Sequence, residues 1–299
     1  MIEITLVCGP TGAGKATWIA RKLRAGNAME HPAHILVQDT GCDGTHPYQQ
    51  LLECLVATAG SAHGDSESQA PDRVFVEVPH QQDVRAIIAR IGEHPILQRN
   101  FAVTELVVVV RSCDGLERLR GDASLRLGIT LADTLVISVV GSASLAQVSR
   151  LAARLRWLSP GANILGTECT QDMDGPLPVE ASDAKPWSVA PACGNESWQR
   201  PAMVAQRLPH DVSWPHLALW LDAVNRAHPD QLLKATGVVN TPNGPLALRS
   251  FGGVLARPVP SPPQTGPPEK NSSTIVFTTQ GMDPELLTRS FSAFVLQAS

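Results

Sequence analysis

Residues 9–15 read GPTGAGK, the most informative stretch of the chain. It has the G-x-x-x-x-G-K spacing of a phosphate-binding loop, in which backbone N–H groups surround phosphate oxygens and the lysine reaches the outer phosphates. An apolar run, residues 2–8, precedes it, and residues 16–24 follow with helical spacing. A strand, a glycine loop and a helix in this order predict a P-loop nucleotide-binding domain. The predicted nucleotide-binding residues are Gly9, Thr11, Gly12, Ala13, Gly14, Lys15, Ala16 and Thr17.

The residue after the lysine departs from the full motif. A P-loop normally continues with Ser or Thr, whose hydroxyl binds Mg²⁺, but here the residue is Ala16. A methyl group cannot ligate a metal ion, although the Thr17 hydroxyl could still reach an inner phosphate. We therefore expect nucleotide to bind while productive placement of Mg²⁺ is harder.

Apolar runs alternate with helical patterns in the first half of the chain. The expected strands are residues 2–8, 34–37, 73–78, 106–110, 134–140 and 162–165, and the expected helices are 16–24, 48–57, 82–91 and 145–158. Such alternation is typical of βαβ units, and the continuous run LVVVV at 106–110 is typical of a strand buried on both faces. We predict an α/β fold with a mainly parallel sheet and helices on both faces.

The alternation stops at residue 167. Residues 167–201 are rich in Pro, Gly, Asp, Ser and Glu, which predicts a flexible linker. Beyond it we expect strands at 203–208, 232–239, 247–256 and 274–279, helices at 214–226 and 284–295, and an extended proline-rich loop at 257–273. The predicted organisation is a P-loop domain at 1–166, the linker, and a smaller α+β domain at 202–299.

Composition and charge exclude several classes of partner. The net charge is −4, which gives no reason to expect nucleic acid or an anionic membrane as a partner. Apolar runs fall well short of the roughly 20 residues that span a bilayer, and we expect a cytoplasmic protein. The six cysteines are scattered, with no C-x-x-C pair, which argues against a disulfide scaffold or a structural zinc site.

These features together resemble the CobW-like P-loop GTPases, relatives of the GTPases that mature urease and hydrogenase. The resembling segments are GAGKAT in the loop, VQDTG at 37–41, RVFVEVPH at 73–80, LADTLVISVVGSASL at 131–145, LLKATGVVN at 232–240 and TIVFTTQGMDPELL at 274–287. The resemblance implies a CobW C-terminal-like second domain, GTP and Mg²⁺ as cofactors, with ATP as an alternative nucleotide, and zinc or cobalt as cargo for a metalloprotein client.

The resemblance also implies site residues. Glu77 matches the Walker B glutamate and Asp39 stands in for the switch glutamate, so both are candidate catalytic residues and Mg²⁺ ligands. A structural hydrogen bond for Glu77 and ordinary turn chemistry for Asp39 are the alternatives. Cys42 is at most a remnant of the family's C-x-C-C metal motif, and one thiolate cannot make a zinc site.

Other departures affect the nucleotide site. His80 replaces a glycine that senses the γ-phosphate, and a surface histidine at a helix start is its alternative role. The guanine-reading motif N-K-x-D is replaced by SVVG at 138–141, which leaves the preference between guanine and adenine open.

Three functional hypotheses follow. The first is a GTP-binding switch with weak or impaired hydrolysis, acting in zinc or cobalt homeostasis or metallocofactor delivery. The second is a catalytically inactive pseudo-GTPase that serves as an interaction scaffold. The third is a small P-loop ATPase or kinase, which does not explain the resemblance of the C-terminal half.

Overall fold

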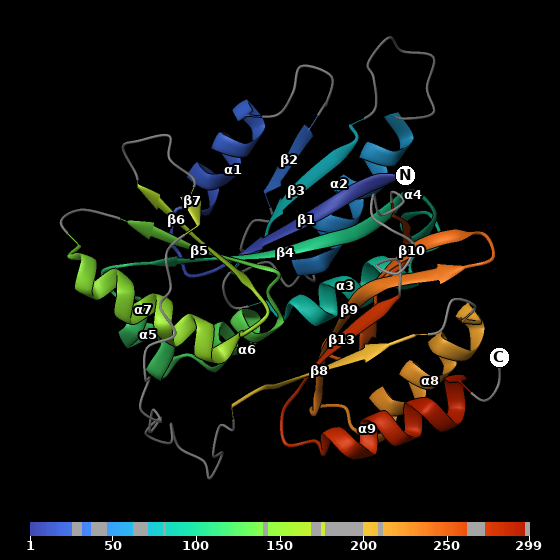
Figure 1. Ribbon diagram of the computed structural model, residues 1–299. Helices are drawn as coiled ribbons and strands as arrows, with labels where there is room; N and C mark the ends of the chain where they lie inside the picture. Colours follow the sequence, from blue (N-terminus) through green and yellow to red (C-terminus); the bar gives the residue numbers. More distant parts are fainter. Residues whose placement is uncertain are drawn as a thin grey trace. The chain divides into compact units, whose positions relative to one another are not determined.

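The structure is a computed structural model that describes residues 1–25, 32–36, 47–61, 71–79, 82–139, 143–168, 175–176, 200–208, 212–261 and 273–296. The chain divides into two compact units, Met1–Trp198 and Gln199–Ser299 (Figure 1). Within the described residues, no helix has the length and apolar character needed to cross a membrane.

The first unit is built on a seven-stranded sheet in the order β2-β3-β1-β4-β5-β6-β7. Its strands are β1 (Ile2–Cys8), β2 (Pro32–Leu36), β3 (Arg73–Glu77), β4 (Phe101–Arg111), β5 (Thr134–Val139), β6 (Asn163–Glu168) and β7 (Gly175–Pro176). Strands β1 to β6 are parallel, and only β7 pairs antiparallel, with β6. The predicted parallel α/β fold is confirmed.

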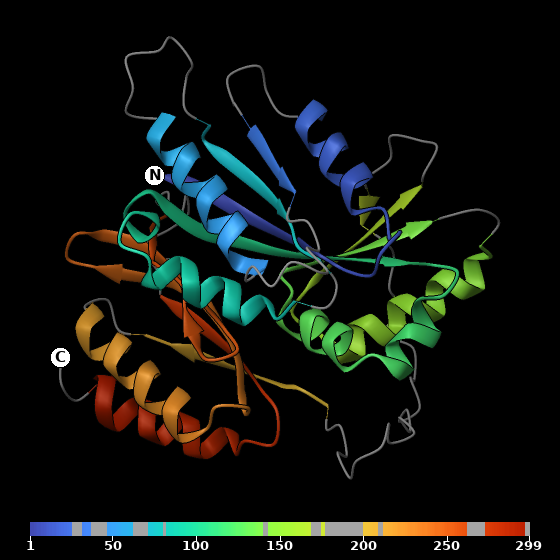
Figure 2. The same cartoon turned by 180° about the vertical axis from the view of Figure 1, so that it is seen from behind.

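The helices of this unit are α1 (Lys15–Ala25), α2 (Pro47–Ser61), α3 (Val84–Glu93), α4 (Leu97–Asn100), α5 (Gly115–Gly121), α6 (Ala123–Leu131) and α7 (Leu145–Leu158). The connection through α1 runs along the sheet in one direction, and all later connections run in the other. Since such crossovers are right-handed, α1 covers one face and α2–α7 the other (Figures 1 and 2). The carboxyl ends of β1, β3, β4 and β5 therefore meet at one edge, where parallel sheets bind ligands.

The core of the first unit fixes α1 against the sheet. Trp18 and Ile19 of α1 pack in a buried cluster with apolar residues of β1, β3, β4 and β5. The rings of Trp18 and Phe75 meet edge to face, with 6.2 Å between their centroids. This packing anchors the helix that begins at the end of the glycine loop.

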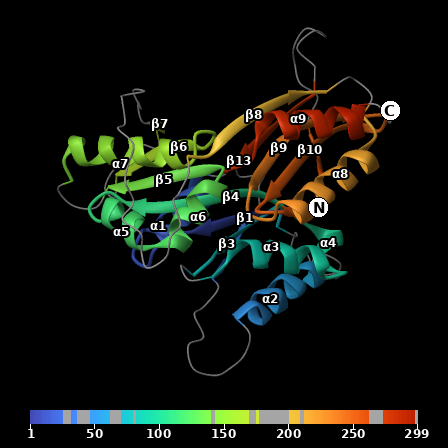
Figure 3. The same cartoon turned by 90° about the horizontal axis from the view of Figure 1, so that it is seen from below.

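The second unit is an antiparallel sheet covered by two helices. Its strands are β8 (Ala202–Arg207), β9 (Leu232–Thr241), β10 (Gly244–Phe251), β11 (Val254–Leu255), β12 (Val259–Pro260) and β13 (Thr274–Thr279), in the order β11-β10-β9-β13-β8 with β12 paired to β10. The helices are α8 (Trp214–Ala227) and α9 (Pro284–Phe291), and a π-helical turn, Ser292–Leu296, continues α9. Figure 3 shows both helices alongside the strands.

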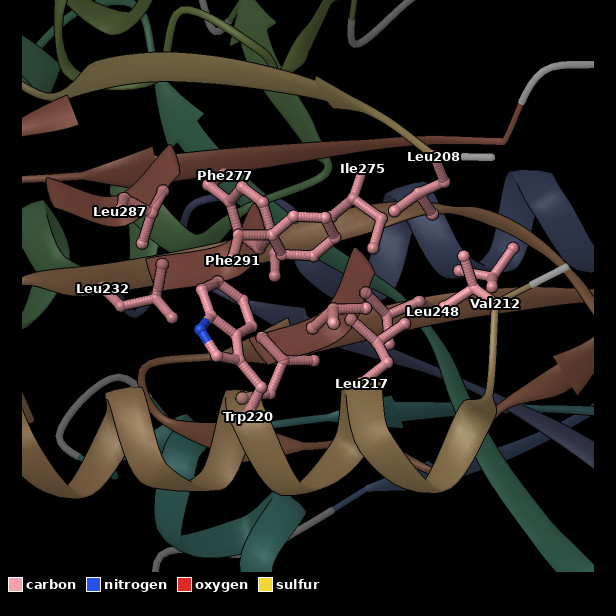
Figure 4. Close-up of a cluster of buried hydrophobic side chains, with 14 of the residues drawn as sticks. Leu208, Val212, Leu217, Trp220, Leu232, Leu248, Ile275, Phe277, Leu287 and Phe291 are labelled. Carbon is pink, nitrogen blue, oxygen red and sulfur yellow. The ribbon is translucent and has the colours of Figure 1, made fainter. Parts of the chain in front are cut away.

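Aromatic side chains make the centre of this second core. Trp220 of α8 points from its helix toward the sheet, where it meets Phe277 of β13 and Phe291 of α9 (Figure 4). Its ring centroid lies 5.5 Å from that of Phe277 and 4.9 Å from that of Phe291, both edge to face. Such pairs contribute about 1 kcal/mol each beyond area burial. The buried face of α8, which includes Leu217, Trp220 and Leu221, is thus part of this core.

Several predicted elements need correction. The strand expected at 106–110 is part of the longer β4, and residues 115–131, for which no element was predicted, form α5 and α6. The strand expected at 247–256 is interrupted, because Gly252 and Gly253 adopt positive φ and turn the chain between β10 and β11. The predicted linker contains the end of β6 and the short β7, and the predicted proline-rich loop contains β12.

Candidate functional site

The loop between β1 and α1 has a backbone that depends on glycine. Gly9, Gly12 and Gly14 all have positive φ, at 135°, 75° and 92°. A Cβ atom on Gly9 would overlap the backbone carbonyl oxygen of Val109, so no other residue fits there. The three glycines of the motif are therefore required by the loop's conformation and by the close approach of β4.

Lys15 is held inside this loop. Its Nζ donates hydrogen bonds to the carbonyl oxygens of Gly9, at 3.0 Å, and Pro10, at 3.2 Å. The same Nζ lies 3.7 Å from Oε1 of Glu77, which ends β3, and the two side chains are only 8% and 14% exposed. The structure thus brings together the lysine and the carboxylate that the sequence assigned to the site, although they are far apart in the chain.

The remaining loop residues differ in exposure. Thr11, Ala16 and Thr17 are exposed, whereas Ala13 is buried. Glu77 could hold a divalent cation, but Ala16 offers no hydroxyl as a second ligand, and Asp39 lies outside the described residues. The loop fits phosphate well through its amides and the helix N-terminus. It fits Mg²⁺ only in part.

On the other side of the loop, β5 holds the backbone directly. The Oγ of Ser138, near the end of β5, donates a hydrogen bond of 2.6 Å to the carbonyl oxygen of Ala13. Ser138 is buried, and a Cβ on Gly14 would lie 3.7 Å from its Cβ. At the position where the resemblance expects the guanine-reading asparagine, a serine therefore braces the loop.

Arg111, the last residue of β4, also lies against the loop. A Cβ on Gly12 would be 3.6 Å from its Nη1. Its Nε donates to Oδ1 of Asp114 at 3.1 Å, its Nη2 contacts Oδ2, and Arg118 donates to the same Oδ2 at 2.7 Å. Asp114 is therefore the centre of an ion-pair cluster beside the loop.

The charges of this cluster reinforce one another. Burial alone would raise the pKa of Asp114, but hydrogen bonds from Arg111 and Arg118 outweigh it and lower the pKa. The hydrogen bond with Asp114 raises the pKa of Arg111. Two cations and one anion leave the cluster with net positive charge next to the loop.

Cys8 directly precedes the loop and is buried. Burial raises the pKa of its thiol to about 12, although Lys15 acts in the opposite direction. The neutral thiol is therefore favoured, and Cys8 packs among the buried residues of the core.

Other predicted site residues fall outside the described part of the chain. These are Asp39, Cys42, His80 and the second half of the SVVG segment, residues 140–141. Across the described ranges, no group of three His, Cys, Asp or Glu side chains is placed to hold a metal ion.

Two residues of the site, Arg111 and Ser138, are not among the binding residues that the sequence predicts. The available signal for Arg111 was its position directly after LVVVV, since a charged residue that follows a buried parallel strand lies at the ligand-binding edge. For Ser138, the sequence indicates only that the asparagine of the N-K-x-D motif is absent. Their positions depend on the pairing of β4 with β5, in which Arg111 is opposite Ser138.

Comparisons with known proteins agree with this architecture. Residues 202–295 match the family described as the cobalamin synthesis protein cobW C-terminal domain. The Zn(II)-bound YjiA GTPase from E. coli is similar in structure, with a TM-score of 0.58, 17% identity and 98% of both chains covered. A Zn(II)-bound triple mutant of YjiA gives a TM-score of 0.61, also with 17% identity and 98% of both chains covered.

A hydrogenase maturation factor, HypB from Archaeoglobus fulgidus, matches at 16% identity and a TM-score of 0.34, over 56% of this chain and 80% of its own. No curated protein matches the sequence. Residues 202–295 thus match the cobW C-terminal domain family in sequence, and nearly the whole chain is similar in fold to the YjiA structures.

Proposed function

We propose that this protein binds GTP at the loop of residues 9–15 and uses it as a conformational switch in zinc or cobalt homeostasis or metallocofactor delivery. The observation that carries the proposal is the placement of Lys15. Its ammonium group is buried in a glycine loop, 3.7 Å from the carboxylate that ends β3. A buried cation costs free energy unless it is paired, and an anionic phosphate is the ligand for which such a loop is built.

Each residue of the loop has a defined part in binding. The amides of the loop and the first turn of α1 would donate to phosphate oxygens, and Lys15 would move its hydrogen bonds from the carbonyl groups of Gly9 and Pro10 to the outer phosphates. Gly9 keeps the loop close to β4, and Ser138 keeps Ala13 in place. Binding therefore needs little rearrangement of the backbone.

Hydrolysis is expected to be weak. A bound Mg²⁺ would neutralise charge on the outer phosphates, and Glu77, helped by Asp39, would hold it. Ala16 removes one normal ligand of this ion. Glu77 would also position the attacking water: the water oxygen would bond to the γ-phosphorus as the bond to the β-phosphate oxygen breaks, GDP would leave, and the proton of the water would pass to the released phosphate. A protein that binds GTP and hydrolyses it slowly would stay in the GTP-bound state for a long time before returning to the GDP-bound state.

The metal-related part of the proposal is supported by the CobW C-terminal domain and by the likeness to a GTPase whose structures hold Zn(II). Zinc or cobalt would be cargo for a metalloprotein client, and not a resident cofactor. Cys42 is the one cysteine next to the predicted switch segment, and it would need ligands from the client or from a second copy of the chain.

Binding of a non-hydrolysable GTP analogue to the full chain tests the proposal. Lys15→Ala should raise the dissociation constant at least about tenfold, because a charge-assisted contact to phosphate is lost. Lys22→Ala is the matched control, since Lys22 lies on the same helix over the ring of Trp18, away from the loop. Equal affinities of wild type and Lys15→Ala would contradict the proposal.

A phosphate-release assay with GTP and ATP separates the remaining hypotheses. Slow release from GTP is the expected result. No binding of any nucleotide would favour the interaction scaffold, and fast release from ATP alone would favour the small ATPase or kinase.

A further inference from the structure

The two sides of the glycine loop carry different groups. In the sheet order β3-β1-β4-β5, Glu77 ends the strand on one side of β1, and Arg111 ends the strand on the other side. Lys15 reaches toward Glu77. In a P-loop the metal ion and the lysine act on the β- and γ-phosphates, so the outer phosphates belong on the Glu77 side. The nucleoside end must then lead away toward β4 and β5.

Arg111 is oriented for a ligand on that side. The carboxylate of Asp114 occupies Nε and Nη2 along one edge of the guanidinium group. The third nitrogen, Nη1, is the one near Gly12. Because Asp114 is itself held by Arg118, the plane of the guanidinium group is fixed before any ligand arrives. Pre-ordering of this kind reduces the entropy lost on binding.

A fixed, planar cation has a specific use at the nucleoside end. Guanidinium groups stack on aromatic faces, which an ammonium group cannot do with the same geometry. The segment that follows Ser138 reads Val139, Val140 and Gly141, so it supplies no carboxylate to pair with guanine. Stacking remains available to either purine, since both present a π-face.

We propose that Arg111 is a nucleotide-binding residue whose guanidinium group, clamped by Asp114 beside Gly12, packs on the purine ring of the bound nucleotide. This inference rests on the proposed nucleotide-binding function. We therefore expect GTP and ATP to bind with similar affinity, because the guanidinium group contacts the face of the base and not the hydrogen-bonding groups at its edge.

Calorimetric titration of the full chain with GTP, ATP and inorganic tripolyphosphate tests this assignment. Arg111→Ala should weaken GTP and ATP binding by about tenfold and leave tripolyphosphate binding within twofold. Arg111→Lys should behave like Arg111→Ala, because it keeps the charge and loses the plane. Arg90→Ala is the control: it removes an exposed arginine in the last turn of α3, outside the Arg111–Asp114–Arg118 cluster, and its effect on all three ligands should be within about twofold.

The outcomes separate the inference from the function beneath it. If wild type binds none of the three ligands, the proposed function fails and the inference fails with it. If wild type binds all three and Arg111→Ala changes nothing, only the inference fails. Equal loss of tripolyphosphate and nucleotide, with rescue by Arg111→Lys, would make Arg111 a phosphate-binding charge and overturn the stacking role. Thermal unfolding of each variant checks that the fold is retained.

Discussion

The two sides of the glycine loop differ in how far their residues can be recognised from sequence motifs. On the β3 side, Lys15 and Glu77 carry motif positions that a family resemblance identifies directly. On the β4 and β5 side, Arg111 belongs to no motif and Ser138 replaces the asparagine of one, and the register of neighbouring strands brings both residues to the loop. The first side has the groups for phosphate chemistry. On the second side, Ser138 braces the loop and Arg111, in our inference, contacts the base. Substitutions on this side could therefore change the base preference without altering the phosphate site.

Both sides of the loop depend on its backbone conformation, and Gly9→Ala should disrupt that conformation with the largest effect on stability. The new Cβ would overlap the carbonyl oxygen of Val109 at a φ of 135°. We expect a loss of about 3 kcal/mol in the free energy of unfolding, measured by urea denaturation. Gly92→Ala is the control, because Gly92 lies in α3 with open space around its Cβ position. That variant should be neutral or slightly stabilising. Equal stability of the two variants would contradict this account of the loop.

On the β3 side, Glu77→Gln should separate turnover from binding. The amide keeps the shape of the side chain and removes the charge that faces Lys15. We expect phosphate release from GTP to fall about tenfold, while GTP affinity without Mg²⁺ is kept or rises. Glu3→Gln is the matched control. Glu3 of β1 forms an ion pair with Arg73 of β3, with 2.9 Å between Oε2 and Nη2. Unchanged turnover in Glu77→Gln would leave Glu77 with a purely structural role.

On the β5 side, Ser138→Ala removes a single brace. The hydrogen bond to Ala13 is lost and its buried carbonyl oxygen loses a donor, which should cost about 1 kcal/mol in stability. The control is Ser112→Ala, since the buried Oγ of Ser112 has no hydrogen-bond partner among the described residues. Its removal should be nearly neutral. A larger loss in Ser112→Ala than in Ser138→Ala would show that the two hydroxyls have been assigned the wrong roles.

The smallest expected effect concerns the ion pairs of Asp114. Because its pKa is lowered in the folded protein, the carboxylate stabilises the fold above its ordinary value of 3.8, and this contribution is lost as the pH falls through the lower folded value. Asp114→Asn should therefore cost about 1 kcal/mol or less near pH 7, and the difference from wild type should shrink below pH 3.8. Chemical denaturation across this pH range measures it. A difference that grows toward acid pH would have the wrong sign.

The same contrast explains how far prediction from sequence could go. Helix Leu145–Leu158 and strand Thr274–Thr279 were predicted to the residue, because strong periodicity and capping agree with the packing. Helices α5 and α6 were missed because Gly121 and Asp122 divide residues 115–131 into two pieces too short for a clear helical period. The end of β10 was missed because a Gly-Gly turn lies inside an apolar run.

The site divides in the same way. GPTGAGK identifies its own loop, since backbone conformation there is set by residues adjacent in sequence. Glu77 could be found because an acidic residue ends a buried strand of recognisable pattern. The role of Arg111 depends on β4 lying between β1 and β5, and the strand order of a parallel sheet is not contained in local spacing.

The central claim is that the loop is a working nucleotide site despite Ala16. The most direct test is calorimetric titration of the full chain with GTP, with and without Mg²⁺. We predict saturable binding at one site per chain that persists when Mg²⁺ is removed, because Lys15 and the loop amides provide most of the contact to phosphate. No detectable binding under either condition would contradict the claim and leave the loop as a structural element of a scaffold protein.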